Sequence, residues 1–196
     1  ITAELYGGGS EMRLLQETCL GFGGWLLLRR LGIRPEVCHL NEGHAAFVVF
    51  ARAWSHMRDH GSDFRCALNA TRAGNVFTTL TPVAVGFDRF APDLLARYTD
   101  WAKQTFGLDM RAMLALGREN PDDDSEPFNM AYLAIRGSIL VNAVSHLHGS
   151  VSRRTIWLVL LAVLAIPLLI IERYSSIRLE ISSRSSSVSS KSLVRW

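Results

Sequence analysis

The sequence has only three cysteines in 196 residues, and their spacing matches neither a disulfide framework nor a zinc motif. Cys19, Cys38 and Cys66 are therefore expected to be reduced thiols in a cytoplasmic protein. Near the first residue no positively charged segment is followed by an apolar run, so no secretory signal is predicted. A chain that begins with Ile1 rather than Met is most simply interpreted as a fragment.

A dinucleotide-binding loop is also missing. Gly21, Gly23 and Gly24 lie inside a helical pattern instead of following a strand, and no G-x-G-x-x-G occurs, which argues against a nicotinamide cofactor. The net charge of +3 comes from residues 172–196, and the preceding residues carry equal numbers of basic and acidic side chains. Without a basic stripe interleaved with aromatic residues, the chain is not expected to bind nucleic acid.

Metal and pyridoxal sites are equally hard to find in the sequence. His39, Glu42 and His44 form H-x-x-E-x-H, which differs from the helical patterns that place two imidazoles on one zinc ion, so no metal is expected. Only Lys103 and Lys191 could form a Schiff base. Neither sequence context is typical of a pyridoxal site.

Helical and strand-like segments alternate along residues 1–154. Helices are predicted over 10–31, 44–58, 92–106, 128–137 and 148–154, with Ser10 as the first N-cap, and strands over 37–40, 75–79 and 139–145. The acidic run 122–126 is predicted to be a solvated loop. This alternation indicates an α/β fold in which parallel strands are layered by helices.

Polar residues follow two of the apolar strands. Glu42 and His44 come directly after the first, and Thr81 comes shortly after the second. In an open α/β sheet, ligands bind beyond the carboxyl ends of the strands. These two strand ends are therefore predicted to form one shared cleft.

The last part of the sequence differs from the rest. Residues 155–171 are predicted to form an apolar helix of uncertain origin, in which the apolar block Ile156 to Ile171 is short for a membrane span. Residues 172–196 are expected to be a disordered tail rich in Ser and Arg. Two interpretations stay open: a membrane anchor, or the product of a shifted reading frame.

Residues 1–154 resemble the α-glucan phosphorylases, the family of the glycogen, starch and maltodextrin enzymes. The residues that carry the resemblance are Leu5 to Gly8, Arg13 to Gly24 with Gln16 and Glu17, His39 to Phe47, Val76 to Phe90, Phe128 to Met130, and Val144 to Arg154.

The resemblance implies a two-lobed glycosyltransferase of the GT-B type, of which this chain is part of the Rossmann-like amino-terminal lobe. It implies an α-glucan and inorganic phosphate as substrates and glucose 1-phosphate as a product. Pyridoxal 5′-phosphate would be bound by a lysine of the other lobe. This chain alone is therefore expected to be inactive, and its oligomeric state stays open.

In the glucosyl pocket, the resemblance assigns substrate contacts to Glu42, His44, Leu80 and Thr81, and it assigns no catalytic residue to this chain. Leu80 and Phe87 stand at positions where family members usually have histidine. Leu80 keeps a main-chain carbonyl that would face the anomeric carbon but loses a side-chain contact to the 6-hydroxyl. The alternative is a non-catalytic carbohydrate-binding or membrane-tethered remnant.

Overall fold

A three-stranded parallel sheet lies at the centre of the fold. The computed structural model describes residues 8–80, 87–99, 101–145 and 149–151. Strands β1 (Cys38–Asn41), β2 (Asn75–Thr79) and β5 (Leu140–Ala143) pair in the order β1-β2-β5, with β2 in the middle. The predicted α/β class with parallel strands is confirmed.

The strands form where the sequence predicts them. β2 has the predicted bounds, and the other two lie within one or two residues of theirs. A second, two-stranded antiparallel sheet joins β3 (Arg89–Phe90) to β4 (Phe128–Asn129).

Most of the helices follow the predicted pattern. The predicted helix over 10–31 is continuous, but it consists of α1 (Ser10–Thr18), the π-helical segment η1 (Cys19–Gly23) and α2 (Gly24–Arg30). The short 3-10 helix η2 (Gly43–Ala45) precedes α3 (Val48–His60). The remaining predicted helices correspond to α5 (Pro92–Thr99), α6 (Trp101–Phe106) and α8 (Met130–Arg136).

Two helices, α4 (Phe64–Arg72) and α7 (Met110–Ala115), were not predicted from the sequence. Asp63 and Asp109 cap them, each accepting a hydrogen bond from the main-chain N–H three residues later. Of the predicted helix over 148–154, the structure describes only residues 149–151, which are helical.

Two details of the first helix differ from the prediction. The N-cap is Gly9, and Ser10 is already helical. In the sequence, Leu15, Cys19, Phe22 and Leu26 repeat at helical spacing and predict an apolar face. Leu15 and Phe22 are half-buried, but Cys19 and Leu26 are exposed, and the fully buried positions are Leu14, Glu17, Gly21 and Trp25.

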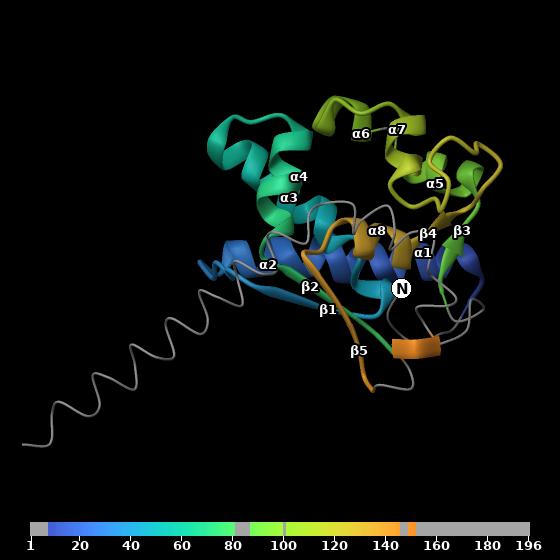
Figure 1. Cartoon of the computed structure of the whole chain (residues 1–196). Helices are drawn as coiled ribbons and strands as arrows, with labels where there is room; N and C mark the ends of the chain where they lie inside the picture. The colour runs from blue at the N-terminus through green and yellow to red at the C-terminus, as the bar shows by residue number, and fades with distance from the viewer. Residues whose placement is uncertain (1–7, 81–86, 100, 146–148, 152–196) are drawn as a thin grey trace, which may run out of the picture. The chain divides into compact units, whose positions relative to one another are not determined.

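One face of the parallel sheet is buried by the helices. In Figure 1 the labelled helices lie on one side of the three strands. Leu40 and Phe77 point into this side and are buried, whereas His39, Asn41 and Leu140 alternate with inward residues and are exposed. The core next to the sheet is rich in phenylalanine, and the rings of Phe47, Phe50 and Phe128 pack with centroids 6.3–6.4 Å apart.

The apolar block Ile156–Ile171 and the tail 172–196 lie outside the described residues, so the predicted division of the chain at residue 154 stays a prediction. Within the part of the chain that is described, no helix combines the length and the apolar character needed to cross a bilayer.

Candidate functional site

The carboxyl ends of β1 and β2 meet as the sequence predicts. Asn41 pairs with Thr78 in the sheet, and the N–H of Glu42 donates to the carbonyl of Thr78 at 3.0 Å. The Glu42 carboxylate in turn accepts a hydrogen bond from the N–H of Leu80. The structure therefore brings Glu42 and Leu80 together at one edge of the sheet, while Thr81 lies outside the described residues.

Glu42 has a strained backbone. Its φ of 66° and ψ of 174° make it the only non-glycine residue with positive φ in the described part of the chain. This region of conformational space is almost restricted to glycine and costs about 1–3 kcal/mol for other residues. Such strain is concentrated at functional sites, so it supports the assignment of this strand end as the candidate site.

The glycine after Glu42 allows η2 to pack closely on α8. A Cβ atom on Gly43 would lie 3.2 Å from the main-chain nitrogen of Ala131 and 3.2 Å from the Cβ of Met130. η2 then places His44 half-buried, two residues after the strained carboxylate.

His44 is held in its neutral form. Burial lowers the pKa of the imidazole and the charge of Arg13 lowers it further, against the opposing charges of Asp88 and Glu42. A neutral imidazole has one donor and one acceptor nitrogen. With the adjacent carboxylate it offers the mixture of groups that binds a sugar hydroxyl.

Sequence reasoning gave no role to three charged residues that complete this site. Arg13 of α1 donates two hydrogen bonds to the Asp88 carboxylate, at 3.2 Å from Nε and 3.0 Å from Nη2. The same Nε lies 3.0 Å from Oε1 of Glu17, whose side chain is 1% exposed. We call Arg13, Glu17, Glu42, His44 and Asp88 the polar cluster.

Two of the acids in the polar cluster, Glu17 and Asp88, have pKa values shifted in opposite directions. Burial raises the pKa of Glu17 to about 9, helped by its hydrogen bond with Asp88 and by the charge of Asp88. Burial also raises the pKa of Asp88, but the hydrogen bonds from Arg13 and Glu17 outweigh it, so this pKa lies below its ordinary value. At neutral pH Glu17 therefore carries a proton and Asp88 carries a charge.

A signal for Glu17 was present in the sequence. An acidic residue on the apolar face of a helix, four residues after an arginine, indicates a buried ion pair or a protonated acid. The predicted face did not include Glu17, so this residue could not be recognised as inward-facing.

The two positions where family members usually have histidine differ from each other in the structure. Leu80 is 39% exposed at the end of β2, whereas Phe87 is buried. Replacement of Phe87 by a polar residue would therefore disturb packing, while the Leu80 side chain faces solvent beside Glu42.

His39 does not belong to the polar cluster. Its Nε2 lies 2.5 Å from Oγ1 of Thr78, and the hydroxyl of Thr78 donates to Asn142 on the next strand. Within the described ranges, no group of three His, Cys, Asp or Glu residues is arranged to hold a metal ion.

The residues that the structure describes do not fit pyridoxal phosphate. Lys103, the lysine that lies in the described part, is exposed on α6, whereas a cofactor lysine needs a pocket around it. Lys191 lies outside the described residues.

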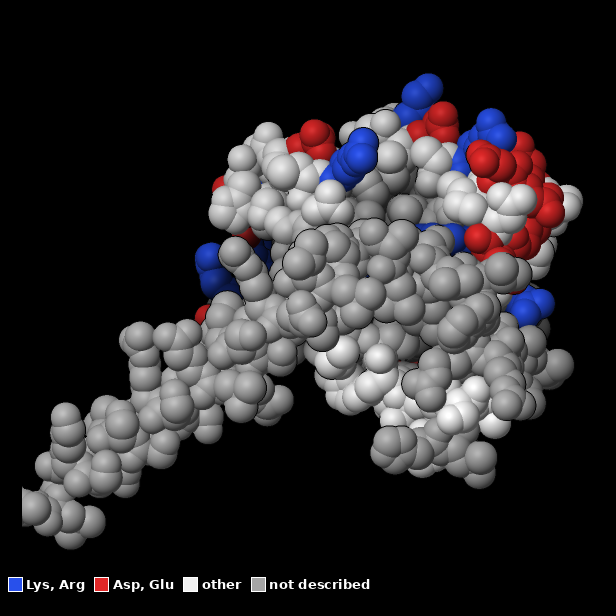
Figure 2. Space-filling view, viewed as in Figure 1, with Lys and Arg blue, Asp and Glu red and all other residues white. Residues whose placement is uncertain are grey.

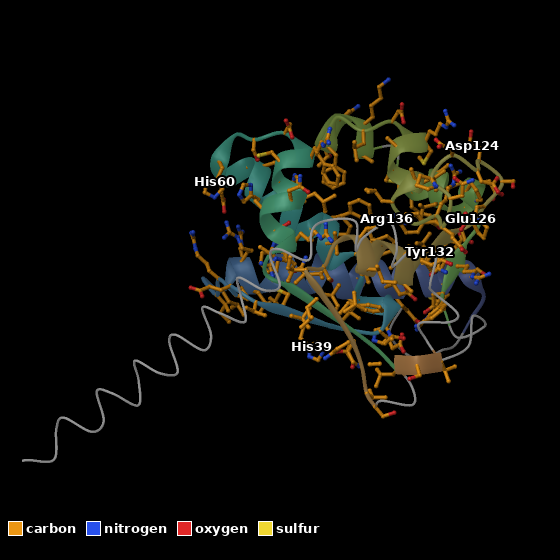
Figure 3. All side chains as sticks on the ribbon, viewed as in Figure 1. His39, His60, Asp124, Glu126, Tyr132 and Arg136 are labelled. Atoms are coloured by element: carbon orange, nitrogen blue, oxygen red, sulfur yellow. The ribbon has the colours of Figure 1, made fainter. Side chains whose placement is uncertain are left out.

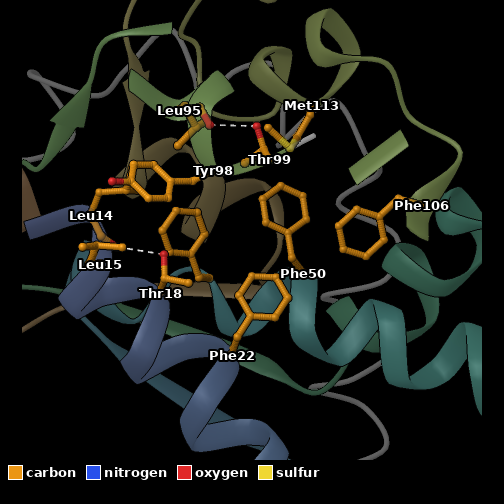
Figure 4. A pocket seen from close by; sticks show the side chains of 11 residues that line it. Leu14, Leu15, Thr18, Phe22, Phe50, Leu95, Tyr98, Thr99, Phe106 and Met113 are labelled. Atoms are coloured by element: carbon orange, nitrogen blue, oxygen red, sulfur yellow. Dashed lines mark hydrogen bonds between the residues drawn. The ribbon is translucent and has the colours of Figure 1, made fainter. Parts of the chain in front are cut away.

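An apolar cavity of about 90 Å³ lies between α1, α3 and the helices α5 to α7 (Figure 4). The hydroxyls of Thr18 and Thr99 on its wall donate to the carbonyls of Leu14 and Leu95. Sugars need several polar partners, so this cavity is not suited to a glucosyl unit. It is lined by Leu14, Leu15, Thr18, Phe22, Phe47, Phe50, Leu95, Tyr98, Thr99, Phe106 and Met113.

Comparison with known proteins identifies glycogen and maltodextrin phosphorylases among the relatives of this chain. The glycogen phosphorylase of Mycobacterium tuberculosis is 40% identical over 164 residues, which cover 78% of this chain and 19% of the relative. The maltodextrin phosphorylase of Thermococcus litoralis is 44% identical over 156 residues, covering 78% of this chain and 18% of the relative. The glycogen phosphorylase of Aquifex aeolicus is 34% identical over 154 residues, with shares of 79% and 22%.

The chain thus spans about a fifth of the length of these relatives. No model of a protein family matches it. The resemblance to the α-glucan phosphorylases is confirmed: most of this chain corresponds to a part of those enzymes.

Proposed function

Starting from this correspondence to glycogen and maltodextrin phosphorylases, we propose that the chain supplies one wall of the glucosyl pocket of an α-glucan phosphorylase. The complete enzyme would cleave the terminal glucose of an α-1,4-glucan with inorganic phosphate and release glucose 1-phosphate. The observation that carries the proposal is the joining of Glu42, His44 and Leu80 at the carboxyl ends of two parallel strands.

Each of these residues has a defined part in the proposal. The Glu42 carboxylate and the neutral His44 imidazole bind sugar hydroxyls, and the main-chain carbonyl of Leu80 faces the anomeric carbon. The hydrogen bond from the Leu80 N–H to Glu42 fixes the carboxylate relative to that carbonyl. Thr81 stays a proposed contact.

The proposal also includes the architecture. The parallel sheet and its helices would be part of the amino-terminal lobe of a two-lobed GT-B enzyme located in the cytoplasm. Because the exposed Lys103 does not fit pyridoxal 5′-phosphate, we assign the cofactor to another part of the enzyme and derive no step through it.

The alternative, a non-catalytic carbohydrate-binding or membrane-tethered remnant, would explain Leu80, Phe87 and the apolar block Ile156 to Ile171 together. The relatives at 40% and 44% identity are enzymes by name, and they favour the enzymatic proposal.

A chimera tests the proposal. Residues 1–154 would replace the matching segment of the Thermococcus litoralis maltodextrin phosphorylase, and release of glucose 1-phosphate from maltodextrin would be measured. We expect activity, and we expect Glu42→Gln to lower kcat/KM by about 100-fold because it removes a charged hydrogen-bond acceptor for the sugar.

The matched control is Glu11→Gln, which changes an exposed carboxylate of α1 and should leave kcat/KM unchanged. If the chimera does not fold, the chain itself is titrated with maltoheptaose and followed by NMR. If maltoheptaose changed the chemical shifts only of amides far from residues 40–44 and 80, the assigned pocket would be refuted.

Leu80→His in the chimera is a second test. An added hydrogen bond to a sugar hydroxyl contributes about 0.5–1.5 kcal/mol, so we expect kcat/KM on maltodextrin to rise about 2- to 10-fold. Leu80→Asn, which is polar but shorter, is the control. Unchanged kinetics with histidine would remove the Leu80 side chain from the site.

A further inference from the structure

The buried acid Glu17 has no evident structural use. Its side chain is 1% exposed, and among the described residues neither of its oxygens accepts a directed hydrogen bond. Burial disfavours a charged carboxylate here, and the nearby Arg13 guanidinium is shared with the Asp88 carboxylate, so the protonated form of Glu17 is favoured. A protonated carboxyl group can donate its proton to a neighbouring acceptor.

Asp88 is that acceptor, and it already accepts both hydrogen bonds of the Arg13 guanidinium. Two acids and one guanidinium thus form a compact unit in which one acid is neutral and the other charged. The same arrangement explains the opposite directions in which the pKa values of Glu17 and Asp88 are shifted.

Asp88 connects this unit to the strand end. Its main-chain carbonyl accepts a hydrogen bond from the N–H of Met130 at 3.1 Å, at the start of α8. Met130 is in turn one of the two residues that Gly43 approaches closely. Displacement of Asp88 would therefore move the start of α8 and, with it, the turn that holds Glu42 and His44.

We propose that Glu17 is a positioning residue of the candidate site: its buried carboxyl group donates a hydrogen bond to Asp88, and the pair holds Arg13 beside His44. Glu17 does not touch the sugar. It fixes the position of the Arg13 charge near His44 and the contact between Asp88 and the start of α8. The inference rests on the proposed function, since it concerns the same pocket.

The first test follows the His44 imidazole by NMR titration of the full chain without sugar. The charged groups that act on His44 are Arg13 from α1, Asp88 before β3, and Glu42. In Glu17→Leu the donor to Asp88 is lost and Arg13 is released, so we expect the pKa of His44 to rise. Glu17→Gln keeps a donor of the same shape, and we expect it to leave this pKa unchanged.

A second NMR signal, the amide resonance of Asp88, reports the loss of the Glu17 proton. In the wild type the Asp88 amide resonance should shift with a midpoint near pH 9, as Glu17 loses its proton, and this step should be absent from Glu17→Gln. The His56 ring, which pairs with Ser62 at the end of α3, is an internal control, and Glu11→Gln is the control variant. If Glu17→Leu does not fold, Arg13→Gln replaces it, with the same expected rise in the pKa of His44.

Equal shifts in Glu17→Gln and Glu17→Leu, or no shift in either, would overturn the proposal. Maltoheptaose is then added to the wild type and to Glu17→Gln. Loss of sugar binding in both, with the titration result intact, would refute the proposed function and leave the positioning role of Glu17 in place.

Discussion

Two arginines in this protein, the half-buried Arg13 and the buried Arg118, are surrounded very differently. Arg13, in the polar cluster, shares its guanidinium between two acids, one of which is buried without a directed donor. Arg118 has a side chain that is only 2% exposed, yet each of its three nitrogens donates: Nε to the carbonyl of Glu126, Nη1 to the Asp124 carboxylate, and Nη2 to the carbonyl of Asp124.

The surroundings of Arg118 stabilise a loop. Glu126 accepts hydrogen bonds from the N–H groups of Glu119 and Asn120, and the Tyr132 hydroxyl donates to Glu119 at 2.8 Å. Figure 3 shows Asp124, Glu126, Tyr132 and Arg136 close to one another. In Figure 2 the acidic side chains of this loop gather on one part of the surface.

The difference between these surroundings distinguishes a group that holds a loop in place from a group that belongs to the candidate site. The Arg118 group is satisfied by hydrogen bonds and by contact with solvent, as expected for a device that only holds a loop. The polar cluster leaves an acid protonated next to a neutral histidine and a strained glutamate, at a cost that packing alone does not explain. A change at Arg118 should therefore lower stability, whereas a change at Glu17 should alter how stability depends on pH.

The largest effect on stability is expected for Arg118→Met. The change removes three hydrogen bonds and releases the loop 119–126, so the free energy of unfolding should fall by about 3 kcal/mol, measured by urea denaturation. Arg111→Met removes an exposed partner of the same Asp124 and should cost under about 0.5 kcal/mol. Equal losses in the two variants would contradict this account of the loop.

The polar cluster should make the stability of the protein depend on pH through the ionisation of Glu17. The folded chain holds a proton on Glu17 up to about pH 9, whereas the ordinary pKa is 4.5. The stability contributed by this proton is complete below about pH 4.5 and is lost as the pH rises towards 9, with a slope of at most about 1.4 kcal/mol per pH unit.

Glu17→Gln cannot ionise and should lose stability less steeply over this range. Urea denaturation of both proteins at several pH values measures the difference in slope, which cancels the contributions of other groups. Parallel curves would show that Glu17 is charged in the folded state.

The smallest effect is expected for Asp124→Asn. The hydrogen bond from Arg118 lowers the pKa of Asp124, so its contribution is present at neutral pH and lost as the pH falls below the ordinary value of 3.8. At pH 7 the Tm of the variant should decrease, but less than that of Arg118→Met, because Arg118 keeps two carbonyl acceptors. At pH 3 the decrease should shrink. A Tm difference that grows in acid would refute the ion pair as its cause.

Much of the fold could be predicted from periodicity and turn residues. The bounds of β2 were predicted correctly because a run rich in β-branched residues follows Gly74 in the sequence and precedes Pro82. Helices α4 and α7 were missed since they are short and depend on aspartate caps and on contacts made only in the folded chain. The buried face of the first helix was predicted only in part because it includes Glu17 and Gly21, which add nothing to an apolar repeat.

The site could be predicted only in part. Glu42, His44 and Leu80 follow strand ends, and strand ends are visible in a sequence. Arg13, Glu17 and Asp88 come together from α1 and from a segment more than seventy residues later, a contact that no local pattern reports. The role of Thr81 stays a prediction.

The backbone of Glu42 has a consequence for laboratory evolution. Glycine tolerates a φ of 66° at no steric cost, so a carboxylate at this position opposes thermodynamic stability. A library of this chain selected only for heat resistance would accumulate glycine at position 42, and any pressure to keep glutamate there must come from what the carboxylate binds.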